Sequence, residues 1–96
     1  MSMMKKYAKK IMSSDNVATC VADVREGDTL FVKNEVGEEA YKAAGDIEFG
    51  HKIALRDIPK GEYIYKYGQK IGKATREIKT GEWVHTHNVA DHYEVK

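Results

Sequence analysis

The segment Trp83-Val84-His85-Thr86-His87-Asn88 contains the residues whose types and spacing are best suited to chemistry. On a strand, alternation would place Trp83, His85 and His87 on one face, with the two histidine Cα atoms about 6.5–7 Å apart. Two imidazoles at that spacing can converge on one metal ion at nitrogen distances of ~2.0–2.1 Å. A solvated strand edge is the alternative explanation. The pair alone therefore gives a metal-site hypothesis that needs further donors.

His51 is a third histidine that its surroundings single out. The pattern Asp/Glu-Val/Ile-x-x-Gly-x-x-aliphatic occurs four times, and its copies begin at Asp23, Asp46, Asp57 and Glu77. Each copy predicts a turn that starts a strand, because glycine accepts the positive φ of a tight turn and the aliphatic residue begins a pleated face. An acidic residue follows the glycine in three copies, but His51 follows it in the second. His51 could therefore supply a third nitrogen if the sheet folds back on itself.

Carboxylates could complete a mixed oxygen and nitrogen shell for iron, manganese or zinc. Each is more simply explained as a turn or surface residue; the candidates are Glu48, Glu62, Glu77 and Glu82. The sequence shows no Ser/His/Asp triad, metalloprotease motif or glycine-rich phosphate loop.

The elements that must position these residues are predicted to be strands. Apolar or β-branched runs separated by turn residues occur at residues 17–22, 29–33, 52–55, 62–67, 70–75 and 82–87. They predict an all-β domain over residues 15–96. Residues 38–44 could form a strand or a helical turn, and this choice stays open. Residues 1–14 are expected to be a flexible or short helical extension, because their apolar residues have helical spacing but the segment is short.

Composition narrows the class of protein. The 96 residues allow one domain with a small core, and a formal net charge of +1 gives no basis for binding nucleic acid. No apolar run long enough for a secretory signal or a membrane span is present, so no membrane partner is expected. The single cysteine, Cys20, lies in an apolar run and is predicted to be a buried, reduced thiol, as suits the cytoplasm.

Several blocks together resemble the amino-terminal module of the altronate/galactarate dehydratase family. The similarity runs from about residue 15 to residue 90, and its blocks are Asp15-Asn16-Val17-Ala18, Phe49-Gly50-His51-Lys52-Ile53-Ala54-Leu55-Arg56-Asp57-Ile58, Lys66-Tyr67-Gly68, Ile71-Gly72-Lys73-Ala74-Thr75 and Val84-His85-Thr86-His87-Asn88. The resemblance implies a SAF-type domain with a β-clip fold.

The resemblance also implies a function. In that family the module works with a much larger catalytic domain or subunit, and two-subunit members include a lyase that removes sulfite from sulfolactate. The implied reaction is elimination of water or sulfite from a hydroxy acid, assisted by a divalent metal, with iron favoured over manganese or zinc. His85 and His87 would contact the metal or the substrate carboxylate, and His51 would act as a further contact or as an acid/base. Lys52 and Arg56 would bind the carboxylate.

Two other classes of function stay open from the sequence. A non-catalytic SAF-type module would bind a saccharide or substrate without a partner. A structural β-domain would self-associate through a stripe of tyrosines at alternate positions, namely Tyr63, Tyr65 and Tyr67.

Overall fold

The structure, a computed structural model, describes residues 5–34 and 37–90. Nine strands form: β1 (Lys6–Lys9), β2 (Val17–Cys20), β3 (Thr29–Asn34), β4 (Gly37–Lys42), β5 (Lys52–Ala54), β6 (Tyr63–Lys66), β7 (Gln69–Ala74), β8 (Trp83–Val84) and β9 (Val89–Ala90). The described residues form no helix, so the all-β prediction is confirmed. Accordingly, no helix in this part of the chain is long and apolar enough to cross a membrane.

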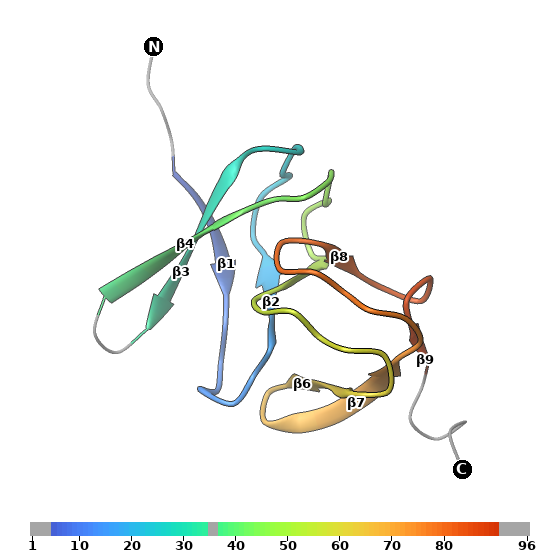
Figure 1. Cartoon of the computed structure of the whole chain (residues 1–96). Helices are drawn as coiled ribbons and strands as arrows, with labels where there is room; N and C mark the ends of the chain where they lie inside the picture. The colour runs from blue at the N-terminus through green and yellow to red at the C-terminus, as the bar shows by residue number, and fades with distance from the viewer. Residues whose placement is uncertain (1–4, 35–36, 91–96) are drawn as a thin grey trace.

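The strands form two sheets (Figure 1). The larger sheet has the order β4-β3-β1-β2-β5-β8, and the smaller has the order β6-β7-β9. Within the larger sheet only the β1–β3 pair is parallel. The buried side chain of Asn16 links the sheets: its Nδ2 donates to the Tyr63 carbonyl at 2.9 Å and its Oδ1 accepts from the Tyr65 N–H at 2.8 Å. These bonds give a hydrogen-bond partner to both the nitrogen and the oxygen of the buried side-chain amide.

The four repeat copies form four similar turns, as predicted from the sequence. Their glycines have φ between +88° and +91° and are Gly27, Gly50, Gly61 and Gly81. The copies associate in two pairs, through backbone bridges that join Val24 to Ile47 and Ile58 to Ile78. Each bridge has two N–H···O bonds of 2.7–2.8 Å. All four bridging side chains are buried, which stabilises the fold by about 1.5–3 kcal/mol for each.

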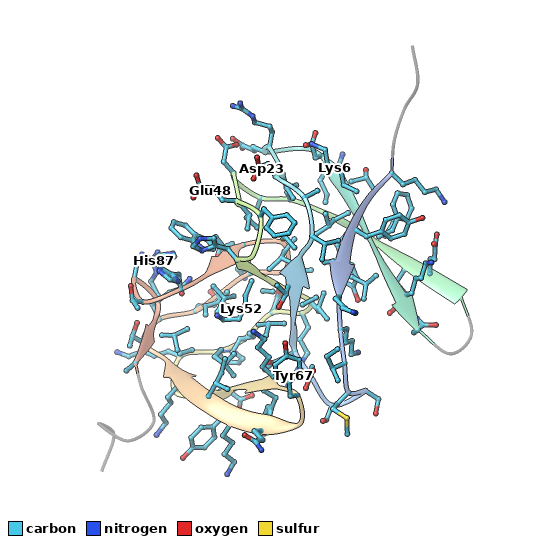
Figure 2. The ribbon with its side chains drawn as sticks, turned by 180° about the vertical axis from the view of Figure 1, so that it is seen from behind. Lys6, Asp23, Glu48, Lys52, Tyr67 and His87 are labelled. Carbon is cyan, nitrogen blue, oxygen red and sulfur yellow. The ribbon has the colours of Figure 1, made fainter. Side chains whose placement is uncertain are left out.

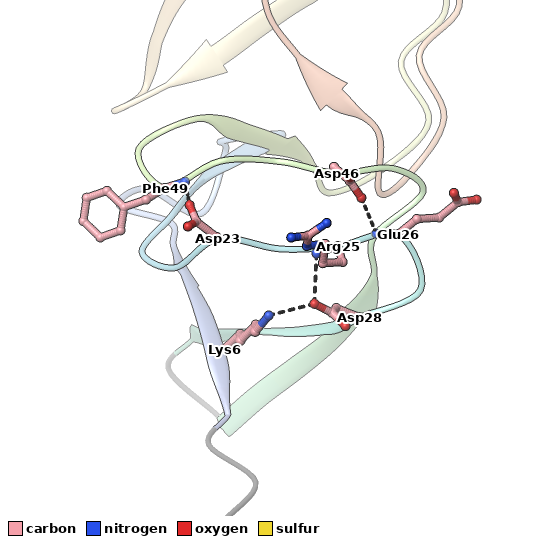
Figure 3. A network of polar contacts seen from close by, with 7 residues as sticks. All are labelled: Lys6, Asp23, Arg25, Glu26, Asp28, Asp46 and Phe49. Atoms are coloured by element: carbon pink, nitrogen blue, oxygen red, sulfur yellow. Dashed lines mark hydrogen bonds and ion pairs between the residues drawn. The ribbon is translucent and has the colours of Figure 1, made fainter.

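The first residue of a repeat copy acts across its pair of turns (Figure 3). Asp23 Oδ1 accepts a hydrogen bond from the Phe49 N–H at 2.8 Å, and Asp46 Oδ1 accepts one from the Glu26 N–H at 2.9 Å. Asp57 does the same for Thr80 at 2.9 Å. These three carboxylates are therefore explained by the turns that they stabilise.

The core is divided in two, following the two pairs of turns. One cluster contains Val24 and Ile47, and the other contains Ile58 and Ile78. Strands β2 and β5 contribute to both clusters, since adjacent strand residues point to opposite faces. Cys20 is fully buried in the first cluster, and burial raises the pKa of its thiol to about 11.

Three expectations about individual segments differ from the structure or are decided by it. The extension expected to be flexible or helical over residues 1–14 contains a strand at residues 6–9 in place of a helix, because β1 pairs with both β2 and β3 and buries Ala8. Residues 1–4 lie outside the described residues. The open segment 38–44 is largely strand β4. Tyr67 lies beyond β6 with φ +56°, so only Tyr63 and Tyr65 of the expected tyrosine stripe are on the strand.

Candidate functional site at the histidine–tryptophan cluster

His51 occupies a turn position at which two other copies of the repeat use a carboxylate to hold the turn. Asp28 accepts a hydrogen bond from the Arg25 N–H at 2.9 Å, and Glu82 accepts one from the Lys79 N–H at 2.8 Å. The His51 imidazole instead faces Trp83, whose Nε1 donates to His51 Nδ1 at 3.2 Å. The backbone turn is unchanged, since the His51 N–H still bonds the Glu48 carbonyl at 3.0 Å. Histidine is therefore not required by the turn itself.

The hydrogen bond from Trp83 defines the protonation of neutral His51. Because Nδ1 accepts, the proton of the neutral ring is assigned to Nε2. Nε2 lies 4.0 Å from Glu48 Oε1, and that carboxylate is 88% exposed. Water screens an ion pair at such an exposed position, so Glu48 orients the ring weakly. His51 thus keeps one ring nitrogen, with its proton, directed away from the indole.

His85 and His87 are not on a strand, so the predicted alternation over residues 82–87 is wrong. Strand β8 ends at Val84, and residues 85–88 form a bend and a turn. The buried Asn88 holds this turn: its Oδ1 accepts from the His85 N–H at 2.9 Å, and its Nδ2 donates to the Trp83 carbonyl at 2.9 Å. The turn replaces the extended backbone because Asn88 closes a hydrogen-bonded ring three residues after His85.

The turn nevertheless brings the imidazoles of His85 and His87 against the indole of Trp83. His85 is stacked on the indole with ring centroids 5.2 Å apart and planes 12° apart, and the His87 centroid lies 4.8 Å from the indole. His51 approaches His85, with ring centroids 5.1 Å apart. We name the set His51, Trp83, His85 and His87 the histidine–tryptophan cluster. The closest pair of histidines in the cluster, His51 and His85, comes from two segments far apart in sequence.

The two histidines of the turn line different hollows. His85 lines a cavity of about 260 Å³ with Lys52, Thr86 and a wall of aliphatic side chains. His87 lines another of about 280 Å³ with Arg76 and Glu82. The pKa of His87 is lowered, first by burial and then by the nearby positive charges of Arg76 and His85. Figure 2 shows His87 and Glu48 on the same side of the molecule.

Lys52 and Arg56, the two predicted carboxylate contacts, have different positions. Lys52 is half-buried in β5 and lines the His85 cavity, where burial, and then the charge of Lys66, lower its pKa. Arg56 lies in an exposed bend after β5 and lines neither cavity. The structure therefore brings Lys52 together with the cluster and leaves Arg56 outside it.

The donors for a metal ion are incomplete within the part of the chain that the structure describes. That part contains no group of three or more His, Cys, Asp or Glu side chains placed to hold a metal. His51 and His85 are near neighbours, but His51 already uses Nδ1 for Trp83. The cluster can contribute imidazole nitrogens to a metal ion only if other ligands come from a substrate or another chain.

Two residues of the site were not given a role from the sequence. Trp83 contacts both turn histidines and donates a hydrogen bond to His51, and Asn88 fixes the turn. The spacing of Asn88 carries a signal, because an acceptor three residues after the donor also occurs at Arg25/Asp28 and Lys79/Glu82. The Trp83–His51 bond joins residues 32 apart and leaves no local signal.

Comparison with known proteins places this chain among dehydratase sequences. The family model of the altronate/galactarate dehydratase SAF domain matches residues 6–92. Altronate dehydratase of Escherichia coli (strain K12) is 43% identical over 79 residues, which are 82% of this chain and 15% of that protein. Galactarate dehydratase (L-threo-forming) of the same organism is 39% identical over 77 residues, 78% of this chain and 13% of that protein.

A relative that is named as a subunit is also similar. The (2R)-sulfolactate sulfo-lyase subunit alpha of Chromohalobacter salexigens is 46% identical over 43 residues, 45% of this chain and 46% of that subunit. The chain therefore spans about 15% of the length of altronate dehydratase and about half of the sulfo-lyase subunit. Since the family model covers nearly the whole chain, from β1 onward, the chain belongs to the SAF domains of the altronate/galactarate dehydratase family.

Proposed function

We propose that this chain is the small SAF-type subunit of a metal-dependent hydroxy-acid lyase and acts with a separate, larger catalytic subunit of the same family in the cytoplasm. Family membership supports lyase chemistry, and two similar proteins are named as subunit alpha of a sulfo-lyase. The substrates to test first are altronate, galactarate and (2R)-sulfolactate, which the names of the relatives suggest.

The observation that carries the proposal is the meeting of His51 and His85 beside Lys52. Two imidazoles with ring centroids 5.1 Å apart supply side chains that can act as acid, base or metal ligand. The half-buried ammonium of Lys52, in the same cavity as His85, supplies charge for a substrate carboxylate. The cavity is small and open to one side of a small domain, which fits a site completed by another subunit.

The reaction would proceed as an elimination. A base removes the proton next to the substrate carboxylate, the electron pair of that C–H bond forms a C=C bond, and the bond to the β-substituent breaks, so that sulfite leaves with the electron pair or a hydroxyl leaves as water after an acid donates a proton to it. The enol then takes up a proton on carbon and loses the proton of its hydroxyl group to give the keto acid. Lys52 would hold the carboxylate, and His51 would transfer a proton through its free Nε2. His85 and His87 would offer imidazole nitrogens beside Trp83.

A divalent metal, iron first and manganese or zinc as alternatives, would supply charge that stabilises the enolate. The imidazoles of His85 and His87 suit these metals, while the remaining ligands would come from the larger subunit or the substrate.

The first test is affinity purification of this chain from its native cell extract, with mass identification of co-eluting proteins and metal analysis. The proposal expects a much larger partner and stoichiometric divalent metal. Turnover of each acid is then measured with the reassembled subunits, each of which should be inactive alone. Recovery of the chain alone and without metal, under conditions that preserve complexes, would count against the proposal.

Substitution then tests the cluster in the assembled enzyme. Replacing His85 and His87 with Ala should remove metal or substrate affinity and leave the fold intact. Of the two single variants, His85→Ala should have a larger effect than His87→Ala, because His85 adjoins both His51 and the Lys52 cavity. Unchanged turnover in the double variant would exclude the assignment.

A non-catalytic module that binds a saccharide or substrate is the second candidate. Trp83 is 36% exposed and could stack on a sugar ring, as indoles do. Calorimetric titration of the isolated chain distinguishes the two functions. Saturable binding of altronate or galactarate without metal or partner would favour the binding module.

A further inference from the structure

A second surface lies on the outer side of the larger sheet, at strands β1 and β3. Tyr7 and Lys9 of β1 point away from the core, since they alternate with the buried Ala8. With Lys10, Val21 and Lys33 they line a hollow of about 380 Å³. A neighbouring hollow of about 340 Å³ shares Lys10 and Lys33 and adds Ile11 and Met12. We name the set Lys9, Lys10, Ile11, Met12, Val21 and Lys33 the lysine face.

The lysine face exposes large apolar side chains together. Ile11 is 49% exposed, Met12 is 48% exposed and Val21 is 45% exposed. They are three of the six large hydrophobic residues that are exposed among the described residues. Apolar side chains that gather around a hollow mark a surface that another molecule covers, whereas single exposed ones need no explanation.

A buried carboxylate holds this surface in place. Asp15 is 5% exposed, and its side chain accepts hydrogen bonds from the Met12, Tyr67 and Gly68 N–H groups at 3.1, 3.0 and 2.8 Å. Burial alone would raise the pKa of Asp15, but these backbone bonds lower it. The turn that exposes Ile11 and Met12 is thus fixed to the β6–β7 hairpin. A surface fixed before binding loses less conformational entropy when a partner docks.

Lysines outnumber carboxylates on this side of the sheet, where Glu38, the cross-strand neighbour of Lys33, pairs with Lys5 at 3.2 Å. No carboxylate of the described residues pairs with Lys9, Lys10 or Lys33, although the neighbouring Lys6 is paired with Asp28 at 2.8 Å. Lys33 lies over the Tyr7 ring, 5.3 Å from its centroid. Since the whole chain has a net charge of only +1, these ammonium groups form a local excess that an acidic partner would complement.

We propose that the lysine face docks an acidic segment of the larger subunit, with apolar side chains between its carboxylates. The inference rests on the proposed function, which supplies that subunit. Apolar side chains among the lysines suit a polypeptide better than a nucleic acid, whose phosphates need mainly charge. The face also lies away from the histidine–tryptophan cluster, with β2 and β5 between β1 and β8. Docking there would leave the cluster free to meet substrate.

A zero-length carbodiimide cross-link tests the contact in the native complex, because it joins lysine amines to carboxylates that are already in contact. Peptide mass analysis should find links from Lys9, Lys10 or Lys33 to aspartates or glutamates of the co-purified larger subunit. Links that come only from lysines elsewhere, such as Lys60 or Lys70, would overturn the proposal.

Charge reversal tests the energetics. The double variant Lys9→Glu/Lys33→Glu should bind the larger subunit at least about tenfold more weakly, with a smaller loss of affinity on adding salt than the unsubstituted chain shows. The matched control Lys60→Glu/Lys70→Glu has the same net charge and should change affinity less than about twofold. Equal affinity of the two variants would overturn the docking proposal. Urea unfolding of both variants confirms that they fold.

Three further outcomes separate the alternatives. If a larger subunit co-elutes and the lysine-face variant binds it normally, the docking proposal fails and the proposed function stands. If no larger subunit exists, both fail. Co-sedimentation with phosphatidylserine/phosphatidylcholine vesicles that Lys9→Glu/Lys33→Glu abolishes would assign the face to a membrane surface instead.

Discussion

Trp83 Nε1 donates a hydrogen bond to Nδ1 of His51, with 3.2 Å between the two nitrogens. The bond connects the second repeat turn to strand β8 and assigns the proton of neutral His51 to Nε2. Histidine thus replaces the turn-holding carboxylate with a ring that faces a neighbouring strand. The consequences of this exchange can be measured separately for stability and for activity.

Replacing His51 with the acidic residue that other copies of the repeat have should affect the stability of the turn and the activity of the enzyme differently. In the His51→Asp variant the new carboxylate can accept the Glu48 N–H, as Asp28 accepts that of Arg25. The free energy of unfolding should stay within about 1 kcal/mol of the unsubstituted chain. If His51 transfers a proton as proposed, turnover of the assembled enzyme should fall by at least about 100-fold. Urea unfolding and steady-state kinetics measure the two quantities.

The control for that variant is Asp28→His, which makes the opposite exchange in the first turn. It removes the hydrogen bonds that Asp28 accepts from Arg25 and Lys6, so the free energy of unfolding should fall. Turnover should be retained. A loss of turnover equal to that of His51→Asp would show that any change in a repeat turn impairs the enzyme.

Lys52→Met should stabilise the chain and impair the enzyme. Burial, and then the charge of Lys66, lower the folded-state pKa of Lys52, so the charged form of Lys52 destabilises the folded state at neutral pH. This effect disappears only when the pH rises above the ordinary pKa of lysine. Removing the charge should raise the free energy of unfolding at pH 7 by less than about 1 kcal/mol, because the ammonium is partly solvated. The kcat/KM for the hydroxy acid should fall at least about tenfold. In Lys60→Met, at an exposed position, neither quantity should change.

Acid should destabilise the fold partly through His87. Its folded-state pKa is lowered, so the unfolded chain binds its proton more readily and stability falls as the pH drops below about 6.5. Charges that face His87 from other segments include Arg76 and Glu82. In His87→Gln the loss of stability between pH 7.5 and pH 5.5 should be smaller than in the unsubstituted chain. Urea midpoints at both pH values check this, and equal losses would contradict it.

Gly81 should tolerate alanine far less well than Gly27, although both have φ near +90°. A Cβ at Gly81 would overlap the Lys42 carbonyl oxygen, whereas a Cβ at Gly27 would meet no atom within 4 Å. Gly27→Ala should therefore cost only the backbone strain, about 1–2 kcal/mol. Gly81→Ala should cost more than about 3 kcal/mol, because the backbone of β4 must move. Thermal and urea unfolding compare the pair, and equal costs would show that β4 shifts freely.

The sequence by itself determined the all-β class, the four turns and the buried Cys20. These follow from local causes: glycine allows positive φ, apolar residues at alternate positions form a buried face, and both signals lie within a few residues of one another. The sequence also identified His51, because a repeat makes a departure visible without any structure. Residues 6–9 were wrongly predicted, because their place between β2 and β3 depends on partners from other segments.

Only the tertiary structure decided how the site is assembled. The local pattern paired His85 with His87, but the hydrogen bonds of Asn88 end the strand, and the fold brings His85 to His51 instead. It likewise placed Lys52 in the His85 cavity and left Arg56 outside. The physical reason is that a side chain's neighbours across a sheet depend on strand order and register, which non-local backbone hydrogen bonds fix and no short stretch of sequence encodes.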